Sequence, residues 1–107
     1  MTVIEVYRRG GAPTGLRVYG HSGCAESGAD VVCAAVSVLV QTLHIGLVDV
    51  LGQNPKREID EENASIELHW DDADAEGTRV LSETIARALY ETAQSYGSYV
   101  KYVEVSL

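Results

Sequence analysis

The sequence predicts an α+β domain in which two helices pack against one mixed or antiparallel β-sheet. Two segments carry the apolar pattern of helices: one at about residues 30–50, and one that starts within the acidic residues 71–76, has apolar residues at helical spacing over 81–93 and ends at Gly97. Shorter segments rich in β-branched residues stand before, between and after them, so the order is strand, strand, helix, strand or hairpin, helix, strand. The length of 107 residues predicts a single domain.

The first quarter of the chain predicts a β-hairpin. Residues 2–8 are the first expected strand, and residues 16–19 alternate between apolar and polar side chains as the second. Between them, Gly10, Gly11 and Pro13 are typical of a turn. Small residues then predict a loop over residues 22–29, before the first helix.

The first helix is expected from Asp30 to about Val50. Asp30 is the expected N-cap, because a carboxylate there can accept hydrogen bonds from first-turn amides. The segment is apolar almost all round, which predicts burial on more than one side, as a central helix or a subunit contact. Gly52 and Pro55 are expected to end it.

The second half of the chain predicts a further strand or hairpin, the second helix and a last strand. Residues 58–60 and 66–70 are the expected strands, and residues 98–107 form the last one. Nine of the sixteen acidic residues lie in an acidic stretch over residues 58–76. A solvated edge that keeps the protein soluble is the favoured interpretation, and a docking surface for a basic substrate is the alternative.

Composition narrows the range of partners. Sixteen acidic against eight basic residues give a formal net charge of −8, which argues against electrostatic binding of nucleic acid or an anionic membrane. No stretch approaches the roughly 20 apolar residues of a spanning helix, and the start lacks the pattern of a signal peptide. Two cysteines are too few for a disulfide scaffold, so we expect a cytoplasmic protein with reduced thiols.

Cys33, in the first turn of the expected helix, is a candidate nucleophile. The helix dipole there favours a thiolate, and first-turn amides could bind an oxyanion. His21 lies twelve residues earlier, at the expected end of a strand, where it could meet the thiol as a base. Ser37 lies one turn beyond Cys33 on the same face, which Gln41 and His44 continue as a polar stripe.

The same residues have structural explanations. A cysteine at the start of an apolar helix is usually a buried small hydrophobe, and Ser37 is commonly bonded to its own helix backbone. Asp30 is by default only a cap. His21, Cys24 and Cys33 lack the paired spacing of a metal site, so neither a metal nor a cofactor is expected.

Residues 20–37 read Gly-His-Ser-Gly-Cys-Ala-Glu-Ser-Gly-Ala-Asp-Val-Val-Cys-Ala-Ala-Val-Ser. This segment resembles the signature of the bacterial ribosomal-processing cysteine protease family called Prp. In that pattern Gly-His is followed by a Gly two residues on, a Gly before an Asp, and then Val-Cys-Ala-Ala-Val-Ser. The length, the order of elements and a Gly-Ser-Tyr near the C-terminus also agree, so residues 1–107 are expected to be one Prp-like domain.

The resemblance implies a cysteine endopeptidase. In the family, the enzyme removes a short N-terminal extension from a protein of the large ribosomal subunit, number twenty-seven. That extension is apolar and ends in aromatic residues just before the cut, and family members are similar to one another in forming homodimers. The expected partners are therefore a basic, N-terminally extended ribosomal protein precursor and a second copy of this chain.

The resemblance also implies roles for individual residues. Cys33 would be the nucleophile, and His21 the base and later the acid. Asp30 and Ser37 would support them, and Gly20 would let the backbone pass close to the dyad.

The loop over residues 22–29 could close over an extended peptide as a lid, with Gly23 and Gly28 as hinges. It contains Cys24 where the family usually has an aromatic residue, often Tyr. A small substitution without consequence is the favoured interpretation. The alternatives are a reshaped peptide pocket and a thiol that pairs with Cys33 on oxidation and switches the enzyme off.

Two other functions are compatible with the sequence. One is a non-enzymatic, ribosome-associated binding module in which Cys33 is core packing. The other is a thiol redox protein that uses Cys24 and Cys33, which the absence of a C-x-x-C motif disfavours.

Overall fold

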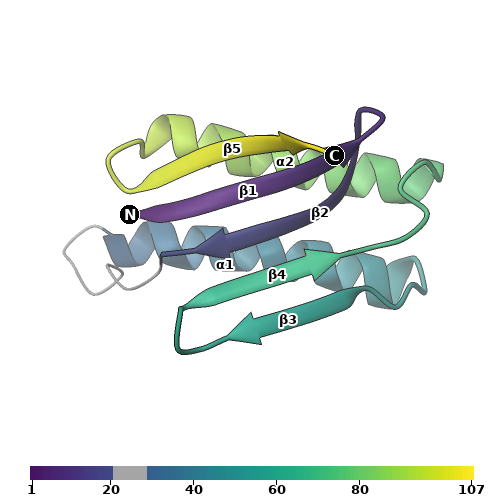
Figure 1. Cartoon of the computed structure of the whole chain (residues 1–107), viewed down its shortest axis with the longest axis horizontal. Helices are drawn as coiled ribbons and strands as arrows, with labels where there is room; N and C mark the ends of the chain where they lie inside the picture. The colour runs from purple at the N-terminus through teal and green to yellow at the C-terminus, as the bar shows by residue number, and fades with distance from the viewer. Residues whose placement is uncertain (21–28) are drawn as a thin grey trace.

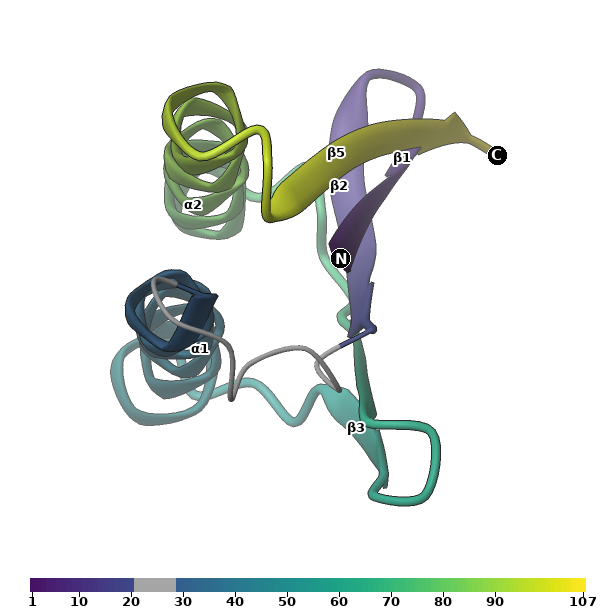
Figure 2. The same ribbon diagram turned by 90° about the vertical axis from the view of Figure 1, so that its left-hand side faces the viewer.

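The computed structural model describes residues 1–20 and 29–107, and the side chains of residues 1–20 and 31–107. The elements are β1 (Thr2–Arg9), β2 (Ala12–Tyr19), α1 (Ala29–Ile45), η2 (Gly46–Val50), β3 (Lys56–Asp60), β4 (Ser65–His69), α2 (Glu76–Ser95) and β5 (Val100–Ser106). The strands form one sheet, and α1 and α2 lie side by side on one of its faces (Figure 1; Figure 2). This two-layer arrangement confirms the α+β prediction.

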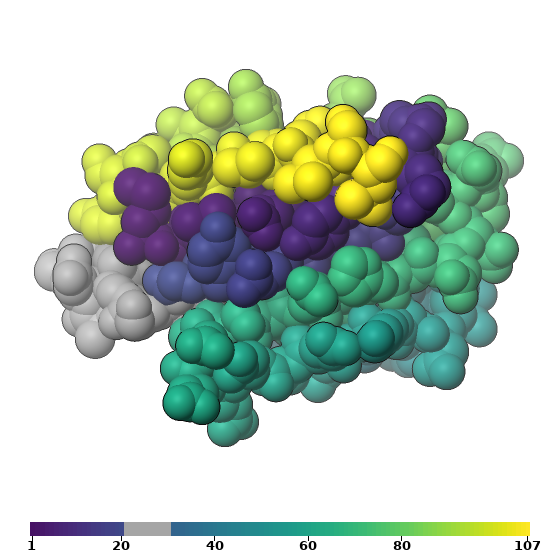
Figure 3. Space-filling view, in the orientation of Figure 1, coloured from purple at the N-terminus to yellow at the C-terminus, as the bar shows by residue number. Residues whose placement is uncertain are grey.

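The sheet is mixed, with the strand order β3-β4-β2-β1-β5. The pairs β1–β2, β2–β4 and β3–β4 are antiparallel, whereas β5 follows α2 and joins the edge parallel to β1. The face opposite the helices is turned toward the viewer in Figure 3, with the strands exposed side by side. The helices therefore cover only one face, and the core lies between that face and α1 and α2.

The turn between β1 and β2 is shorter than the sequence predicted. Gly10 and Gly11 form it with φ of 61° and 87°, the left-handed conformation that two-residue hairpin turns require. β2 therefore begins at Ala12, four residues before its expected start. Pro13, expected in the turn, lies inside β2 opposite Arg8, next to a register shift where the ladder is already irregular.

The core is built from the alternation along the central strands. Ile4 and Val6 of β1 lie beside Val18 and Leu16 of β2, and all four are fully buried. Burying one such side chain stabilises the fold by about 1.5–3 kcal/mol. The helices cover this layer with Val32, Val36, Val40, Leu43, Leu47, Ile85, Ala86, Leu89 and Ala93.

The first helix leaves its outer face exposed in the single chain. α1 and η2 together end at Val50, as predicted. However, Val31, Val38 and Ile45 on the outer face are 65%, 58% and 53% exposed. α1 packs on α2 as well as on the sheet, but its outer face is uncovered in the single chain. The expected central helix is therefore wrong, and the alternative, a subunit contact, stays a prediction.

The segment Val31–Val50 is long and apolar enough to cross a membrane, and it is the one such helix in the described part of the chain. The expectation that no stretch approaches this length is therefore wrong. A core helix passes the same test of length and composition, and the inner face of this one packs on the sheet.

The acidic stretch divides between two ends of the sheet. Glu61 and Glu62 lie in the turn between β3 and β4, and Asp71 and Asp74 lie in the loop after β4. β4 separates the two groups by about 17 Å, the length of five extended residues. Because β4 runs antiparallel to β2, the first group lies at the Gly20 end of β2. Glu58 and Glu67 pair across β3 and β4 between the two groups, so both interpretations of the acidic stretch stay predictions.

Arg8 ties β1 to α2 and β5. Its Nη1 and Nη2 donate to Glu83 Oε2 and Oε1 at 2.8 and 2.9 Å, and its Nε lies 3.0 Å from Glu104 Oε2. The Arg8 and Glu83 side chains are only 17% and 26% exposed, so solvent screens their attraction weakly. The hydrogen bonds from Arg8 lower the pKa of the Glu83 carboxyl below its usual 4.5.

Replacing Glu83 by Gln is expected to lower the free energy of unfolding by about 1–2 kcal/mol near pH 7, because a charge-assisted pair is lost. Since the pKa of Glu83 is depressed in the folded state, this stabilisation is present above pH 4.5 and is lost as the pH falls through the folded value. Urea unfolding at pH 7 and pH 2 measures the change. Glu91→Gln, at an exposed position of α2, is the control; a Glu83→Gln effect equal at both pH values would contradict the prediction.

Candidate active site

Cys33 is the fifth residue of α1 and is half-buried. The helix begins at Ala29, so Asp30 is its second residue and not the residue that precedes it. The expected N-cap role of Asp30 is therefore wrong, because the chain enters the helix earlier than the sequence predicted. An acidic residue in the first turn still suits the positive end of the helix dipole.

The position of Cys33 also changes the expected oxyanion site. In an α-helix the amide of each residue bonds to the carbonyl four residues earlier, so the Cys33 amide is directed at the Ala29 carbonyl. Only the first turn presents amides that point out of the helix end. The amides around Cys33 are therefore bonded within the helix and are not free to bind an oxyanion, as the sequence had predicted.

The Cys33 sulfur faces the start of β1. Thr2 Oγ1 lies 3.8 Å from Cys33 Sγ, and Thr2 is only 4% exposed. The Thr2 amide donates to the Tyr99 carbonyl at 2.9 Å, which fixes the backbone at this point. A hydroxyl held beside a sulfur can donate a hydrogen bond to the thiolate and stabilise it.

Gly20 lies beside Thr2, at the start of β1. It has φ of 86°, and a Cβ there would overlap the carbonyl oxygen of Met1 and lie 3.6 Å from Thr2 Cα. Only glycine fits both the conformation and the space. Thr2 therefore lies between Gly20, at the end of β2, and the Cys33 sulfur. Because Gly20 immediately precedes His21 in the sequence, this contact brings the chain close to Cys33 just before His21.

Cys33 is disulfide-bonded in this structure. The other cysteine of the chain, Cys24, lies outside the described residues. A sulfur in a disulfide has no thiolate with which to attack a substrate. Nucleophilic chemistry at Cys33 therefore requires the reduced form, and the oxidation interpretation of Cys24 stays a prediction.

Several of the predicted residues lie outside the described part of the chain. These are His21, Gly23, Cys24 and Gly28, so the dyad partner and the lid over residues 22–29 stay predictions. Within the ranges 1–20 and 29–107, no group of three or more His, Cys, Asp or Glu side chains gathers as a metal site.

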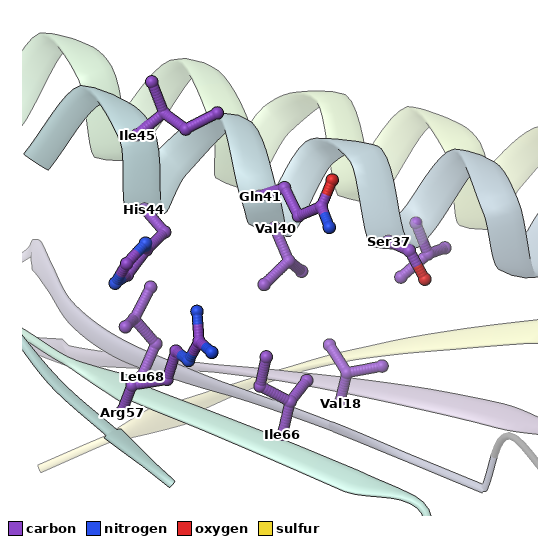
Figure 4. Close-up of a pocket in the computed structure, with 10 residues that line it drawn as sticks. Val18, Ser37, Val40, Gln41, His44, Ile45, Arg57, Ile66 and Leu68 are labelled. Carbon is purple, nitrogen blue, oxygen red and sulfur yellow. The ribbon is translucent and has the colours of Figure 1, made fainter. Parts of the chain in front are cut away.

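A cavity of about 470 Å³ opens between α1 and the strands β2, β3 and β4 (Figure 4). We call it the α1 groove; it is lined by Val18, Val36, Ser37, Val40, Gln41, His44, Ile45, Arg57, Ile66 and Leu68. The polar stripe predicted on the first helix, Ser37, Gln41 and His44, runs along it. Ser37 lies at the end nearer Cys33, and His44 lies with Arg57 at the other end.

The family model described as cysteine protease Prp matches residues 1–101. The chain belongs to the Prp family of cysteine proteases. This confirms the resemblance in residues 20–37 and the prediction of a cysteine protease. No curated protein matches the chain.

Solved structures share the fold. SMU.848 from Streptococcus mutans has a TM-score of 0.91 and 23% identity, over 100% of this chain and 96% of that one. The essential ribosomal processing protease Prp from S. aureus, in complex with a substrate peptide, has a TM-score of 0.88 and 16% identity over 98% of this chain and all of its own. Its complex with a covalently linked product peptide has a TM-score of 0.86 and 17% identity, with the same coverage.

Within the Prp family fold, Cys33 lies between two features. On one side are Thr2 and Gly20, and on the other the α1 groove begins at Ser37. The sequence predicted Gly20, Cys33 and Ser37 as site residues, and their roles stay predictions. It did not predict Thr2, which lies beside Cys33, or Arg57, which lines the α1 groove. The one signal for Thr2 was a polar residue on the inward side of a strand, two positions before Ile4.

Replacing Thr2 by Val keeps the shape of the side chain and removes its hydroxyl. Reduced Cys33 should then react with iodoacetamide at pH 7 about three- to tenfold more slowly, because one hydrogen bond to the thiolate is lost. Mass spectrometry of labelled Cys33 measures the rate, in a Cys24→Ala background that leaves one thiol. Thr2→Ser should restore the rate; equal rates in all three proteins would refute a role for the hydroxyl.

Proposed function

We propose that this chain is an endopeptidase that removes the N-terminal extension of large-subunit ribosomal protein number twenty-seven, with Cys33 and His21 as its catalytic dyad. The observation that carries the proposal is the location of Cys33, in a chain of the Prp family, between the Gly20 end of β2 and an apolar groove. The name of the S. aureus relative, a ribosomal processing protease, supports a ribosomal substrate.

The reaction uses only groups of this chain and water. His21 takes the proton from the Cys33 thiol, and the sulfur attacks the scissile carbonyl carbon. The C–N bond breaks as His21 passes the proton to the leaving amine, so the extension remains on the sulfur as a thioester. Water, deprotonated by His21, then hydrolyses the thioester and frees Cys33. The covalently linked product peptide of the S. aureus structure is consistent with such a bond in that protein.

Supporting groups surround this dyad in the proposal. Ser37 lies one helical turn beyond Cys33, at the near end of the α1 groove, in which we place the peptide. We assign to Asp30, in the first turn of α1, the orientation of His21, and to the loop over residues 22–29 the closure over the peptide, with Gly23 and Gly28 as hinges.

The reaction requires a reduced Cys33. We therefore place the protein in the cytoplasm, where thiols are kept reduced, and assign it no cofactor. The −8 charge of the chain favours association with a basic ribosomal protein.

Cleavage of a peptide that spans the extension tests the proposal, with the products identified by mass spectrometry. The reduced wild-type protein should release one N-terminal fragment, and Cys33→Ala should release none, because the nucleophile is absent. Cys24→Ala is the matched control and should cleave. Cleavage by Cys33→Ala at the wild-type rate would overturn the proposal, and binding without cleavage by the reduced wild type would favour a non-enzymatic binding module.

We further propose that the protein is a homodimer that forms through the outer face of α1. The α1 stripe, made of Val31, Ala35, Val38, Thr42 and Ile45, faces away from the sheet at alternating spacings of three and four residues. This spacing is the one by which two helices pack along a seam. Residues 31–48 contain no Asp, Glu, Lys or Arg, so two copies that carry −8 each can approach here with little repulsion.

Val38→Glu is expected to convert the dimer into monomers, because it buries a charge from each copy in the seam. Size-exclusion chromatography with light scattering measures the mass. Gln94→Glu adds the same charge at an exposed position of α2 and should leave the dimer intact. A monomeric wild type at micromolar concentration would contradict the dimer, and its binding to uncharged lipid vesicles would assign the α1 stripe to a membrane instead.

A further inference from the structure

We propose that the Thr2 hydroxyl stabilises the thiolate of Cys33 and thereby sets the pH at which Cys33 becomes reactive. The inference rests on the proposed function, in which the Cys33 sulfur attacks a carbonyl carbon. It adds to the proposed dyad a third residue, from the sheet, that acts on the attacking sulfur. Thr2 and Cys33 are 31 positions apart in the sequence, so only the fold brings them together.

Thr2 is the polar member of an apolar row. The residues of β1 that face the helices are Thr2, Ile4 and Val6, and they are 4%, 0% and 1% exposed. A hydroxyl buried in such a row is costly unless it forms a hydrogen bond. Thr2 Oγ1 lies 3.8 Å from Cys33 Sγ, so the sulfur of α1 is a partner for this hydroxyl.

The protonation state of Cys33 decides the direction of this hydrogen bond. A neutral thiol can either donate to the hydroxyl or accept from it, whereas a thiolate has no proton and can only accept. Thr2 Oγ1 must therefore donate once Cys33 is ionised. Hydrogen bonds to an ionised acceptor are stronger than those between neutral groups. The contact therefore stabilises the thiolate more than the thiol, which makes Cys33 reactive at a lower pH.

The backbone of α1 does not supply this donor. The Cys33 amide is directed at the Ala29 carbonyl, so it points along the helix and not at the sulfur. The half-buried position of Cys33 also removes part of the water that would solvate a thiolate. A donor from β1 offsets this loss of solvent, and the Thr2 hydroxyl lies within reach.

The backbone around Thr2 holds the hydroxyl in place. The start of β1, the start of α1 and the turn after α2 lie at one end of the molecule (Figure 1; Figure 2). In that turn the Tyr99 amide donates to the Tyr96 carbonyl at 2.9 Å, and the Tyr99 carbonyl accepts from the Thr2 amide, also at 2.9 Å. The Gly-Ser-Tyr of residues 97–99 thus anchors Thr2. A donor that is already in place costs no reorganisation when the charge forms.

The other titratable groups around this contact are the same in every variant described below. The sheet residues that face α1 here, Ile4 and Val18, and the last buried residue of α2, Ala93, do not titrate. On the described elements around Cys33 the titratable groups include the Met1 amino group, Asp30, Tyr96, Tyr99 and Tyr102, together with His21 of the proposed dyad. A change in pH dependence on removal of the Thr2 hydroxyl is therefore due to that hydroxyl.

Labelling of reduced Cys33 as a function of pH tests the contact directly. Iodoacetamide reacts with the thiolate, so the rate rises with pH to a plateau. Mass spectrometry follows the rate in a Cys24→Ala background that leaves one thiol. Thr2→Val keeps the shape of the side chain and should move the midpoint of this rise to higher pH by about 0.5–1 unit. Thr2→Ser should restore the midpoint.

Thr78→Val is the matched control. Thr78 is 1% exposed, and its hydroxyl accepts a hydrogen bond from Gln53 Nε2 near the start of α2, at the opposite end of that helix from Tyr96. The change removes another buried hydrogen bond and should lower stability without moving the midpoint. An unchanged midpoint in Thr2→Val, or an equal shift in Thr78→Val, would overturn the inference.

The pH dependence of peptide cleavage tests whether the contact acts in the reaction. The acid limb of kcat/KM reports groups of the free enzyme that must lose a proton. In Thr2→Val this limb should move to higher pH by the same amount as the labelling curve, whereas Thr78→Val should follow the wild type. A labelling shift without a shift of the acid limb would overturn the role of Thr2 in the attack. A labelling shift in a protein whose wild type does not cleave the extension peptide would support the contact and refute the proposed function alone.

Discussion

The packing of α1 on the central strands holds the site in place. Val32 and Val36 flank Cys33 in the sequence and are buried against the layer that contains Ile4 and Val18. Because these side chains lock the rotation and the height of the helix, the Cys33 sulfur must face Thr2 at the start of β1. The hydrophobic core thus fixes the position of Cys33, and such rigidity suits its proposed role as a nucleophile that has to meet a carbonyl carbon at a fixed distance.

α1 then serves three purposes with three faces. Its inner face is the core, its outer face is the uncharged α1 stripe, and the edge between them is the polar stripe of the α1 groove. This division explains why the segment is apolar almost all round and yet exposes Val38 and Ile45. A helix that only covered a sheet would carry charges on its outer face.

The sequence predicted those features that depend on neighbouring residues. The alternation of Ile4 and Val6 and the helical spacing in α1 are local patterns, and so the elements and the fold class were predicted correctly. The start of β2 was not predicted correctly, because the position of Pro13 in the strand depends on an irregular register with β1. The contact of Thr2 with Cys33 joins residues 31 positions apart, and no local pattern contains it.

The candidate site shows the same division. Gly20, Cys33 and Ser37 were identified from the motif in residues 20–37. Arg57 was missed, because its side chain reaches the α1 groove only through the pairing of β3 with β4. Asp30 was misplaced by a small shift of the helix start, which changed its role from cap to first-turn residue.

The most direct test of the central claim compares labelling of Cys33 with loss of activity in the same samples. Reduced protein carrying Cys24→Ala is treated with iodoacetamide at pH 7, and the labelled fraction of Cys33 and the remaining cleavage activity are measured over time. A catalytic Cys33 predicts that activity falls in proportion to labelling, and that the extension peptide slows both. Complete labelling of Cys33 with unchanged cleavage would contradict its role as the nucleophile.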